Sequence, residues 1–245
     1  MTVNAYPGAG TPPQRNDRKL LIQVLVAVAL VTVIAVVGAV LVLRKTATAD
    51  DTVAGQALPV TPRNVAADGS VRVGDSDAKV TVRLVADLQC PACQAFEKLN
   101  GAVLEDVVAK GEAAVEYSII TFLDRASTDQ YSSRAGNASY CVANTGTENY
   151  QKWLKAMFEQ QPHEGGAGLP DSTLIDIAER AGYTDPAVAQ CITERTYDNY
   201  LRGKTQEVFA TGVNSTPTVL VNGTKVPNSQ LGTQNGLAAV IAAAR

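Results

Sequence analysis

A Cys-x-x-Cys motif lies at the junction of a predicted strand and a predicted helix, and it restricts the possible folds more than any other feature of the sequence. The segment AKVTVRLVADLQC is rich in valine with partial alternation, which predicts a strand over residues 79–86. Apolar residues then recur at helical spacing up to Gly111. Pro91 directly follows the first cysteine and suits the first helical turn, where a missing N–H is harmless. The motif is therefore expected to begin a helix.

The segments that follow predict an α/β fold. The sequence AAVEYSIITFL predicts a second strand over about 114–122, and a crossover helix makes the two strands parallel neighbours in one sheet. A helical block fills about 126–205, and TPTVLVNGTKV then predicts a β-hairpin that turns at Asn222-Gly223. A closing helix follows in QNGLAAVIAAA. The individual helices before the hairpin are expected near residues 131–146, 148–161, 171–182 and 185–212.

The position of the motif favours redox chemistry at its two sulfurs. Free N–H groups and the helix dipole favour a thiolate at Cys90. Cys93 lies nearly one turn later, so the two sulfurs can close a small disulfide or release it. Cys90 would then be the exposed nucleophile and Cys93 the resolving partner. A Cys-x-x-Cys beside a βαβ pattern is typical of thioredoxin-like sites.

Two other uses of the motif are open but less favoured. Zinc would need two further ligands, whereas Cys141 and Cys191 stand alone about 50 residues apart in separate predicted helices. A purely structural Cys90–Cys93 bridge closes a short loop and constrains the unfolded chain little. We therefore expect redox exchange at these cysteines and no metal site.

A long apolar segment precedes this domain. Residues 20–43 contain no charge, and at 1.5 Å per helical residue they would reach roughly 36 Å, enough to cross a bilayer core of about 30 Å. We expect a transmembrane helix. A cleaved signal peptide is the main alternative, because Ala47-Thr48-Ala49 resembles a cleavage site, although signal segments are shorter. A buried core helix is the other alternative, and the uniform apolarity disfavours it.

The flanks of this segment suggest how the chain is organised. Basic residues slightly favour a cytoplasmic N-terminus. Residues 1–19 are expected to form a cytoplasmic tail, residues 44–69 a linker and residues 70–245 the catalytic domain outside the cytoplasm. The expected location is thus the cell membrane, with a single span. The net charge of −3 carries no sign of a nucleic-acid partner, and the one histidine, His163, is expected to be a solvated loop residue.

Two motifs together resemble a known family. VRLVADLQCPACQAFE, followed far downstream by VNSTPTVLVNG, is similar to the DsbA-like branch of the thioredoxin superfamily, in particular to membrane-anchored DsbA homologues of mycobacteria and other actinobacteria. The resemblance covers about residues 70–245. It implies a thioredoxin fold with an inserted helical domain, preceded by one N-terminal transmembrane helix, and no cofactor.

The resemblance also assigns roles to individual residues. It implies that Cys90 and Cys93 are catalytic and that the Thr216–Pro217 bond is cis, with its loop against the active-site disulfide. Pro91, Ala92, Thr216 and Pro217 would contact the substrate. Related actinobacterial proteins carry a second bridge, which implies a structural Cys141–Cys191 disulfide; two separate core thiols are the alternative.

Three positions near the motif bear on its redox strength. Ala92 stands where the best-known DsbA pattern has histidine, and Leu84 stands where many relatives have a buried acid. Both differences imply a milder oxidant. Asp87 is common in the DsbA-like branch, and it could assist proton transfer from Cys93 or be a plain surface or capping residue.

The expected activity is the oxidation of thiols in exported proteins. The substrates would be unfolded polypeptides with free thiols, and the resemblance implies a VKOR-like membrane protein that reoxidises the pair. A reductase or isomerase of the same fold is one alternative. A non-redox, membrane-tethered binding module or holdase is another. We expect a monomer, since no dimerisation stalk is visible.

Overall fold

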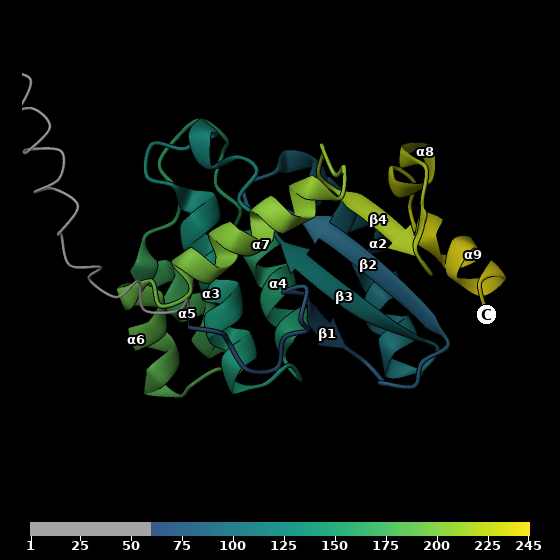
Figure 1. The fold of residues 1–245 in the computed structure, drawn as a ribbon, viewed down its shortest axis with the longest axis horizontal. Helices are drawn as coiled ribbons and strands as arrows, with labels where there is room; N and C mark the ends of the chain where they lie inside the picture. Colours follow the sequence, from purple (N-terminus) through teal and green to yellow (C-terminus); the bar gives the residue numbers. More distant parts are fainter. Residues whose placement is uncertain (1–59) are drawn as a thin grey trace, which may run out of the picture. The chain divides into compact units, whose positions relative to one another are not determined.

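The computed structural model describes residues 60–245, in which five strands form one sheet with the order β1-β3-β2-β4-β5 (Figure 1). The two central strands, β2 (Val80–Ala86) and β3 (Ala113–Ile119), are parallel and are joined by helix α2 (Pro91–Ala109). The other pairings are antiparallel and involve β1 (Val71–Val73), β4 (Thr218–Val221) and β5 (Thr224–Lys225). The predicted βαβ unit and the hairpin at Asn222-Gly223 are therefore confirmed.

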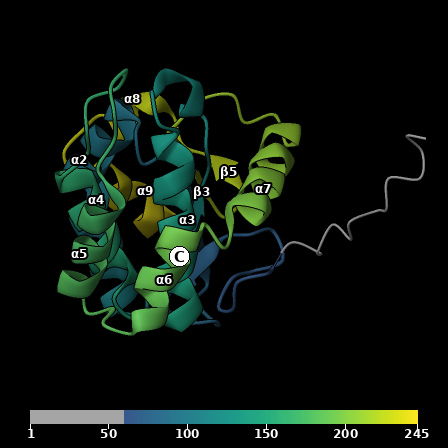
Figure 2. The same ribbon diagram turned by 90° about the vertical axis from the view of Figure 1, so that its left-hand side faces the viewer.

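The central strands are covered on both faces. All residues of β3 except Glu116 are buried, as expected for parallel strands with helices on either side. Figure 2 shows α2 and α7 (Asp198–Ala210) on opposite sides of the sheet. Helix α2 buries Phe96 and Leu104 against it and ends before Gly111, whose φ of +66° closes the turn at low steric cost.

A helical block separates β3 from β4, as the sequence predicts. It contains the short turn η1 (Asp124–Ala126) and helices α3 (Tyr131–Thr145), α4 (Tyr150–Glu159), α5 (Asp171–Ala181), α6 (Pro186–Glu194) and α7. Two short helices, α8 (Asn228–Leu231) and α9 (Gly236–Ala243), follow the hairpin.

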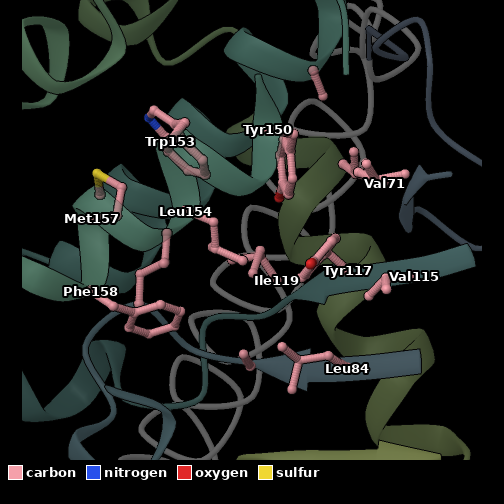
Figure 3. Close-up of a cluster of buried hydrophobic side chains, with 14 of the residues drawn as sticks. Val71, Leu84, Val115, Tyr117, Ile119, Tyr150, Trp153, Leu154, Met157 and Phe158 are labelled. Atoms are coloured by element: carbon pink, nitrogen blue, oxygen red, sulfur yellow. The ribbon is translucent and has the colours of Figure 1, made fainter. Parts of the chain in front are cut away.

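Helix α4 joins this block to the sheet through a buried aromatic cluster (Figure 3). The ring of Tyr150 lies 5.4 Å from the rings of both Tyr117 on β3 and Trp153 on its own helix. Leu154 and Phe158 extend the same face toward the strands. These residues belong to one buried cluster, so the helical block and the sheet share a core. Burial of each large ring stabilises this core by about 1.5–3 kcal/mol.

Two predicted elements have different boundaries in the structure, and two observed elements were not predicted. The single helix expected over residues 185–212 is wrong, because Arg195 adopts a left-handed conformation with φ +57° and separates α6 from α7. There the N–H of Tyr197 donates to Asn137 Oδ1 at 2.8 Å, a tertiary bond that no local pattern signals. Strand β3 ends at Ile119 rather than near residue 122, and the chain then turns into the helical block. Neither β1 nor α8 was expected.

The predicted membrane segment, residues 20–43, lies outside the described residues, as do the tail 1–19 and most of the linker. Within residues 60–245 no helix combines the length and apolarity that a membrane span requires. The last part of the predicted linker contacts α3: the N–H of Arg63 donates to Asn144 Oδ1 at 2.9 Å, and Asn64 Nδ2 donates to the carbonyl of Ala143 at 2.9 Å. Ordered contacts with the domain thus begin before residue 70.

Candidate active site

The Cys-x-x-Cys motif lies where β2 ends and α2 begins. Cys90 is the N-cap of α2 and Pro91 is its first residue, as the sequence predicts. Both cysteines are free thiols, so the structure represents the reduced state. Cys90 is 7% exposed and Cys93 is 1% exposed. The expectation of an exposed Cys90 is therefore wrong in degree, because the loop around Pro217 packs against it, although Cys90 is still the more accessible of the two.

The environment of the two thiols gives them different acidities. A hydrogen bond from the Cys93 thiol, together with the backbone N–H groups of Ala92 and Cys93 at the helix start, lowers the pKa of Cys90 to about 6. Burial raises the pKa of Cys93 well above its usual value. At neutral pH, Cys90 is thus largely a thiolate and Cys93 a thiol that donates to it.

The loop that precedes β4 covers the thiols from the other side. The Thr216–Pro217 bond is cis, which confirms the expectation for this motif. The Cys90 sulfur lies 3.5 Å from the carbonyl oxygen of Thr216. Beside this contact is a small hollow of about 270 Å³, lined mainly by Ala92, Ala95, Phe96, Thr216, Pro217 and Leu231. Of the four residues expected to contact the substrate, Ala92, Thr216 and Pro217 line this hollow. The fourth, Pro91, is exposed at the start of α2 and does not line it.

Asp87 is buried beneath the motif and is not a surface residue. Its Oδ1 accepts hydrogen bonds from the N–H of Gln89 at 2.8 Å and the hydroxyl of Ser132 at 2.7 Å, and its Oδ2 accepts one from the N–H of Leu123 at 2.7 Å. Burial nevertheless raises its pKa to about 6, and the nearby Cys90 thiolate adds to the increase. Leu84, which stands where relatives carry an acid, is buried in the sheet.

Two polar residues of the helical block were not expected at the site. Gln161, just after α4, donates from Nε2 to the carbonyls of Leu88 at 2.9 Å and Cys90 at 3.1 Å. The hydroxyl of Ser132 on α3 donates to the carboxylate of Asp87. Glutamine and serine in helical segments carry no sequence signal for such roles, since only the tertiary packing brings them to the motif.

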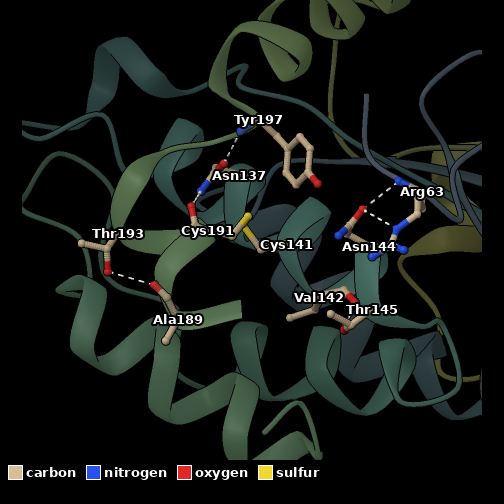
Figure 4. The surroundings of a disulfide bond; sticks show 10 residues. All are labelled: Arg63, Asn137, Cys141, Val142, Asn144, Thr145, Ala189, Cys191, Thr193 and Tyr197. Carbon is tan, nitrogen blue, oxygen red and sulfur yellow. Dashed lines mark hydrogen bonds between the residues drawn. A yellow bond between two sulfur atoms is a disulfide. The ribbon is translucent and has the colours of Figure 1, made fainter. Parts of the chain in front are cut away.

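The remaining two cysteines are joined to each other (Figure 4). Cys141 on α3 and Cys191 on α6 form a disulfide with a Cα–Cα distance of 5.7 Å, as the resemblance implies. Asn137 Nδ2 donates to the carbonyl of Cys191 at 3.3 Å beside it. Because these sulfurs are bonded to each other, they are not available to complete a zinc site with Cys90 and Cys93. His163 is exposed in its loop.

A comparison with protein families decides the classification. The family model described as thioredoxin matches residues 66–242. The chain belongs to the thioredoxin family. The matched range includes the motif, the helical block and the Thr216–Pro217 loop of this thioredoxin-family protein.

Solved structures with the same fold include several disulfide-exchange proteins. Reduced DsbA from Mycobacterium tuberculosis matches this thioredoxin-family chain with a TM-score of 0.59 and 33% identity, over 72% of this chain and 99% of that chain. The thiol-disulfide oxidoreductase MdbA from Corynebacterium diphtheriae matches with a TM-score of 0.60 and 23% identity, over 74% and 92% of the two chains. At that identity, the second likeness shows the fold alone.

Curated relatives give a more mixed picture. Serine/threonine-protein kinase PknE of Mycobacterium tuberculosis is 34% identical over 127 residues, which are 50% of this chain but only 22% of the kinase. Disulfide bond formation protein D of Bacillus subtilis is 22% identical over 187 residues, 76% of this chain and 78% of that protein. The match to DsbA from Mycobacterium tuberculosis, which this chain covers almost completely, supports a thiol-disulfide oxidoreductase of the DsbA type.

Proposed function

We propose that this protein introduces disulfide bonds into unfolded exported polypeptides through the Cys90–Cys93 pair. The observation that carries the proposal is the position of Cys90 at the N-terminus of α2, beside Cys93 and 3.5 Å from the carbonyl oxygen of Thr216, and its lowered pKa supports it. A thiol whose pKa is near 6 is a good leaving group, and a stabilised thiolate favours the reduced form of the pair. A pair with a stabilised reduced form accepts electrons readily, which is the property of an oxidase rather than a reductase.

The reaction starts from the oxidised pair. A substrate thiolate attacks the Cys90 sulfur, the Cys90–Cys93 bond breaks, and Cys93 leaves with the electron pair and takes up a proton. A mixed disulfide now joins the substrate to Cys90. The second substrate thiolate attacks the substrate sulfur of that bond and releases Cys90 as a thiolate. Two electrons have moved from the substrate to the pair, and the substrate carries a new disulfide.

The residues around Cys90 support binding of an extended chain. Backbone groups beside Pro217 are close to the Cys90 sulfur, and strand-like pairing there would place the attacking thiol in line with it. The hollow beside Phe96 and Leu231 has the size and apolar lining to hold one side chain of the substrate. Recognition would then depend mostly on the main chain, which suits many different substrates.

Continued turnover needs an electron acceptor. We infer that a VKOR-like membrane protein reoxidises the pair and that the apolar segment 20–43 holds the catalytic domain beside it, outside the cytoplasm. The inference rests on the sequence of that segment and on the resemblance to anchored DsbA homologues. The catalytic domain itself would act as a monomer.

A refolding assay with purified oxidised protein tests the proposed activity. A reduced, disulfide-containing protein such as ribonuclease A is incubated in the absence of glutathione with an excess of the oxidised enzyme, so that at least one Cys90–Cys93 pair is present for each disulfide that the substrate must form. We expect loss of substrate thiols and gain of ribonuclease activity with the wild type and neither with Cys90→Ser. Equal recovery with the two proteins would instead support a holdase.

A further inference from the structure

Two exposed phenylalanines meet on the surface near the candidate active site. Phe122 follows β3 and is 38% exposed, and Phe209 near the end of α7 is 39% exposed. Their rings form an edge-to-face pair with centroids 5.9 Å apart. Apart from Val60, they are the exposed large hydrophobic residues of residues 60–245. An aromatic pair left open to water is typical of a binding surface.

Two arginines make this surface basic. A hollow of about 560 Å³ lies beside the rings, and its lining includes Phe122, Arg125, Arg202, Phe209, Val213 and Asn214. No carboxylate lines it, although Asp198 lies close enough to Arg202 to feel its charge. Within the described residues, neither arginine forms an ion pair. On a chain with a net charge of −3, two unpaired guanidinium groups around an apolar hollow favour an acidic ligand.

The surface is connected to the active-site motif through two segments of the chain. The N–H of Leu123 donates to Asp87 Oδ2 at 2.7 Å, which ties the Phe122 segment to the base of the motif. Val213 and Asn214 belong to the loop that continues to Pro217. Beneath the hollow, Val85, Ile120 and Val208 form a separate buried cluster. A chain bound at Pro217 therefore has this hollow within reach.

We propose that the hollow between Phe122 and Phe209 binds a segment of the polypeptide that exchanges disulfides at Cys90, a segment in which an aromatic or large aliphatic side chain stands beside carboxylates. The proposal rests on the proposed function and names a preference among its substrates. The phenylalanines take the apolar side chain, and Arg125 and Arg202 take the carboxylates. A concave site beside the thiols suits a peptide side chain better than a flat lipid surface.

Dithiol peptides that differ only in a tail test this preference. The tails contain Phe between two Glu, Phe between two Lys, or Ser between two Ser, placed on either side of the cysteines. The single-turnover rate constant for oxidation of each peptide is measured with the oxidised wild type, with Arg125→Glu/Arg202→Glu, and with the control Lys152→Glu/Arg180→Glu, whose residues are exposed on α4 and α5.

We expect the charge-reversed variant to oxidise the Glu–Phe peptide about tenfold more slowly than the wild type and the Lys–Phe peptide faster, with the Ser peptide and the control variant unchanged. In Phe122→Ser/Phe209→Ser, the advantage of Phe over Ser should disappear while the advantage of Glu over Lys remains. Equal rates for all three peptides with the wild type, or an equal change for all three in the variants, would overturn the proposal.

Two further measurements separate this proposal from its alternatives. Oxidation of dithiothreitol tests the chemistry alone: if the wild type does not oxidise it, the proposed function fails, whereas an active enzyme without peptide preference loses only the present proposal. Co-sedimentation with phosphatidylglycerol vesicles tests a lipid surface. Binding that the arginine variant loses, with peptide rates unaltered, would assign the surface to lipid and contradict our proposal.

Discussion

The hydrogen bond from Cys93 to the Cys90 thiolate is the largest single cause of the acidity of Cys90. Cys93→Ala removes this donor and leaves the smaller contributions of the contact with Thr216 and of the backbone N–H groups. We therefore expect the pKa of Cys90 to rise from about 6 toward its ordinary value near 9, as measured by thiolate absorbance at 240 nm. An unchanged midpoint would mean that the helix N-terminus alone stabilises the thiolate. The same variant should accumulate mixed disulfides through Cys90, since no resolving thiol remains.

Asp87 acts on Cys90 through its charge. When both groups are ionised, each raises the free energy of the other, and both have pKa values of about 6. Asp87→Asn removes the negative charge, so we expect the titration midpoint of Cys90 to fall by roughly half a pH unit. Alkylation by iodoacetamide below pH 6 should then be faster. The control is Asp106→Asn, an exposed position on α2, the helix that begins after Cys90. It should change neither the titration midpoint nor the alkylation rate.

At the scale of secondary-structure elements, the Cys141–Cys191 disulfide fastens α3 to α6. The bridge spans 50 residues, and a loop of that length is expected to contribute about 4 kcal/mol to stability. Cys141→Ala/Cys191→Ala should lower the free energy of unfolding in urea by about that amount. The pKa of Cys90 should not move, because the bridge does not contact the motif. A loss below about 1 kcal/mol would show that packing alone holds the two helices.

Local patterns predicted most elements, and tertiary contacts decided the rest. The helical spacing of apolar residues and the position of Pro91 predicted α2 with Cys90 at its start. Both signals are local, because they depend only on residues within the helix itself. The break at Arg195 carries no local signal, because neither glycine nor proline marks it. It is accompanied by tertiary contacts instead: the N–H of Tyr197 donates to Asn137, and the Cys141–Cys191 disulfide lies nearby. The short strand β1 has only three residues and gains its stability from pairing with β3.

The candidate site was predictable to a similar extent. The two cysteines and the Thr216–Pro217 loop could be located, because they carry a motif and a resemblance. The bonds of Asp87, Ser132 and Gln161 could not be predicted, since they join residues up to 73 positions apart. The burial of Cys90 also depends on a loop 126 residues away in sequence.

For the whole molecule, the acidity of Cys90 links stability to pH. Its folded pKa of about 6 is lower than its ordinary value of 9, so the thiolate stabilises the reduced fold above pH 9 and this contribution is lost as the pH falls through 6. The reduced wild type should therefore gain on the order of 2 kcal/mol over reduced Cys90→Ser between pH 6 and pH 9. Urea unfolding of both proteins in excess reductant measures the difference. A constant difference would contradict a stabilised thiolate.

The central claim is that Cys90 and Cys93 form a reversible, oxidising disulfide. Its most direct test is the reduction potential of the pair, obtained by equilibrating the protein in glutathione buffers and counting alkylated thiols by mass. We predict a single two-electron transition nearer to about −120 mV, the value of a strong oxidant, than to about −270 mV, the value of thioredoxin itself. A potential near the lower value, or a pair that never forms a disulfide, would contradict the account.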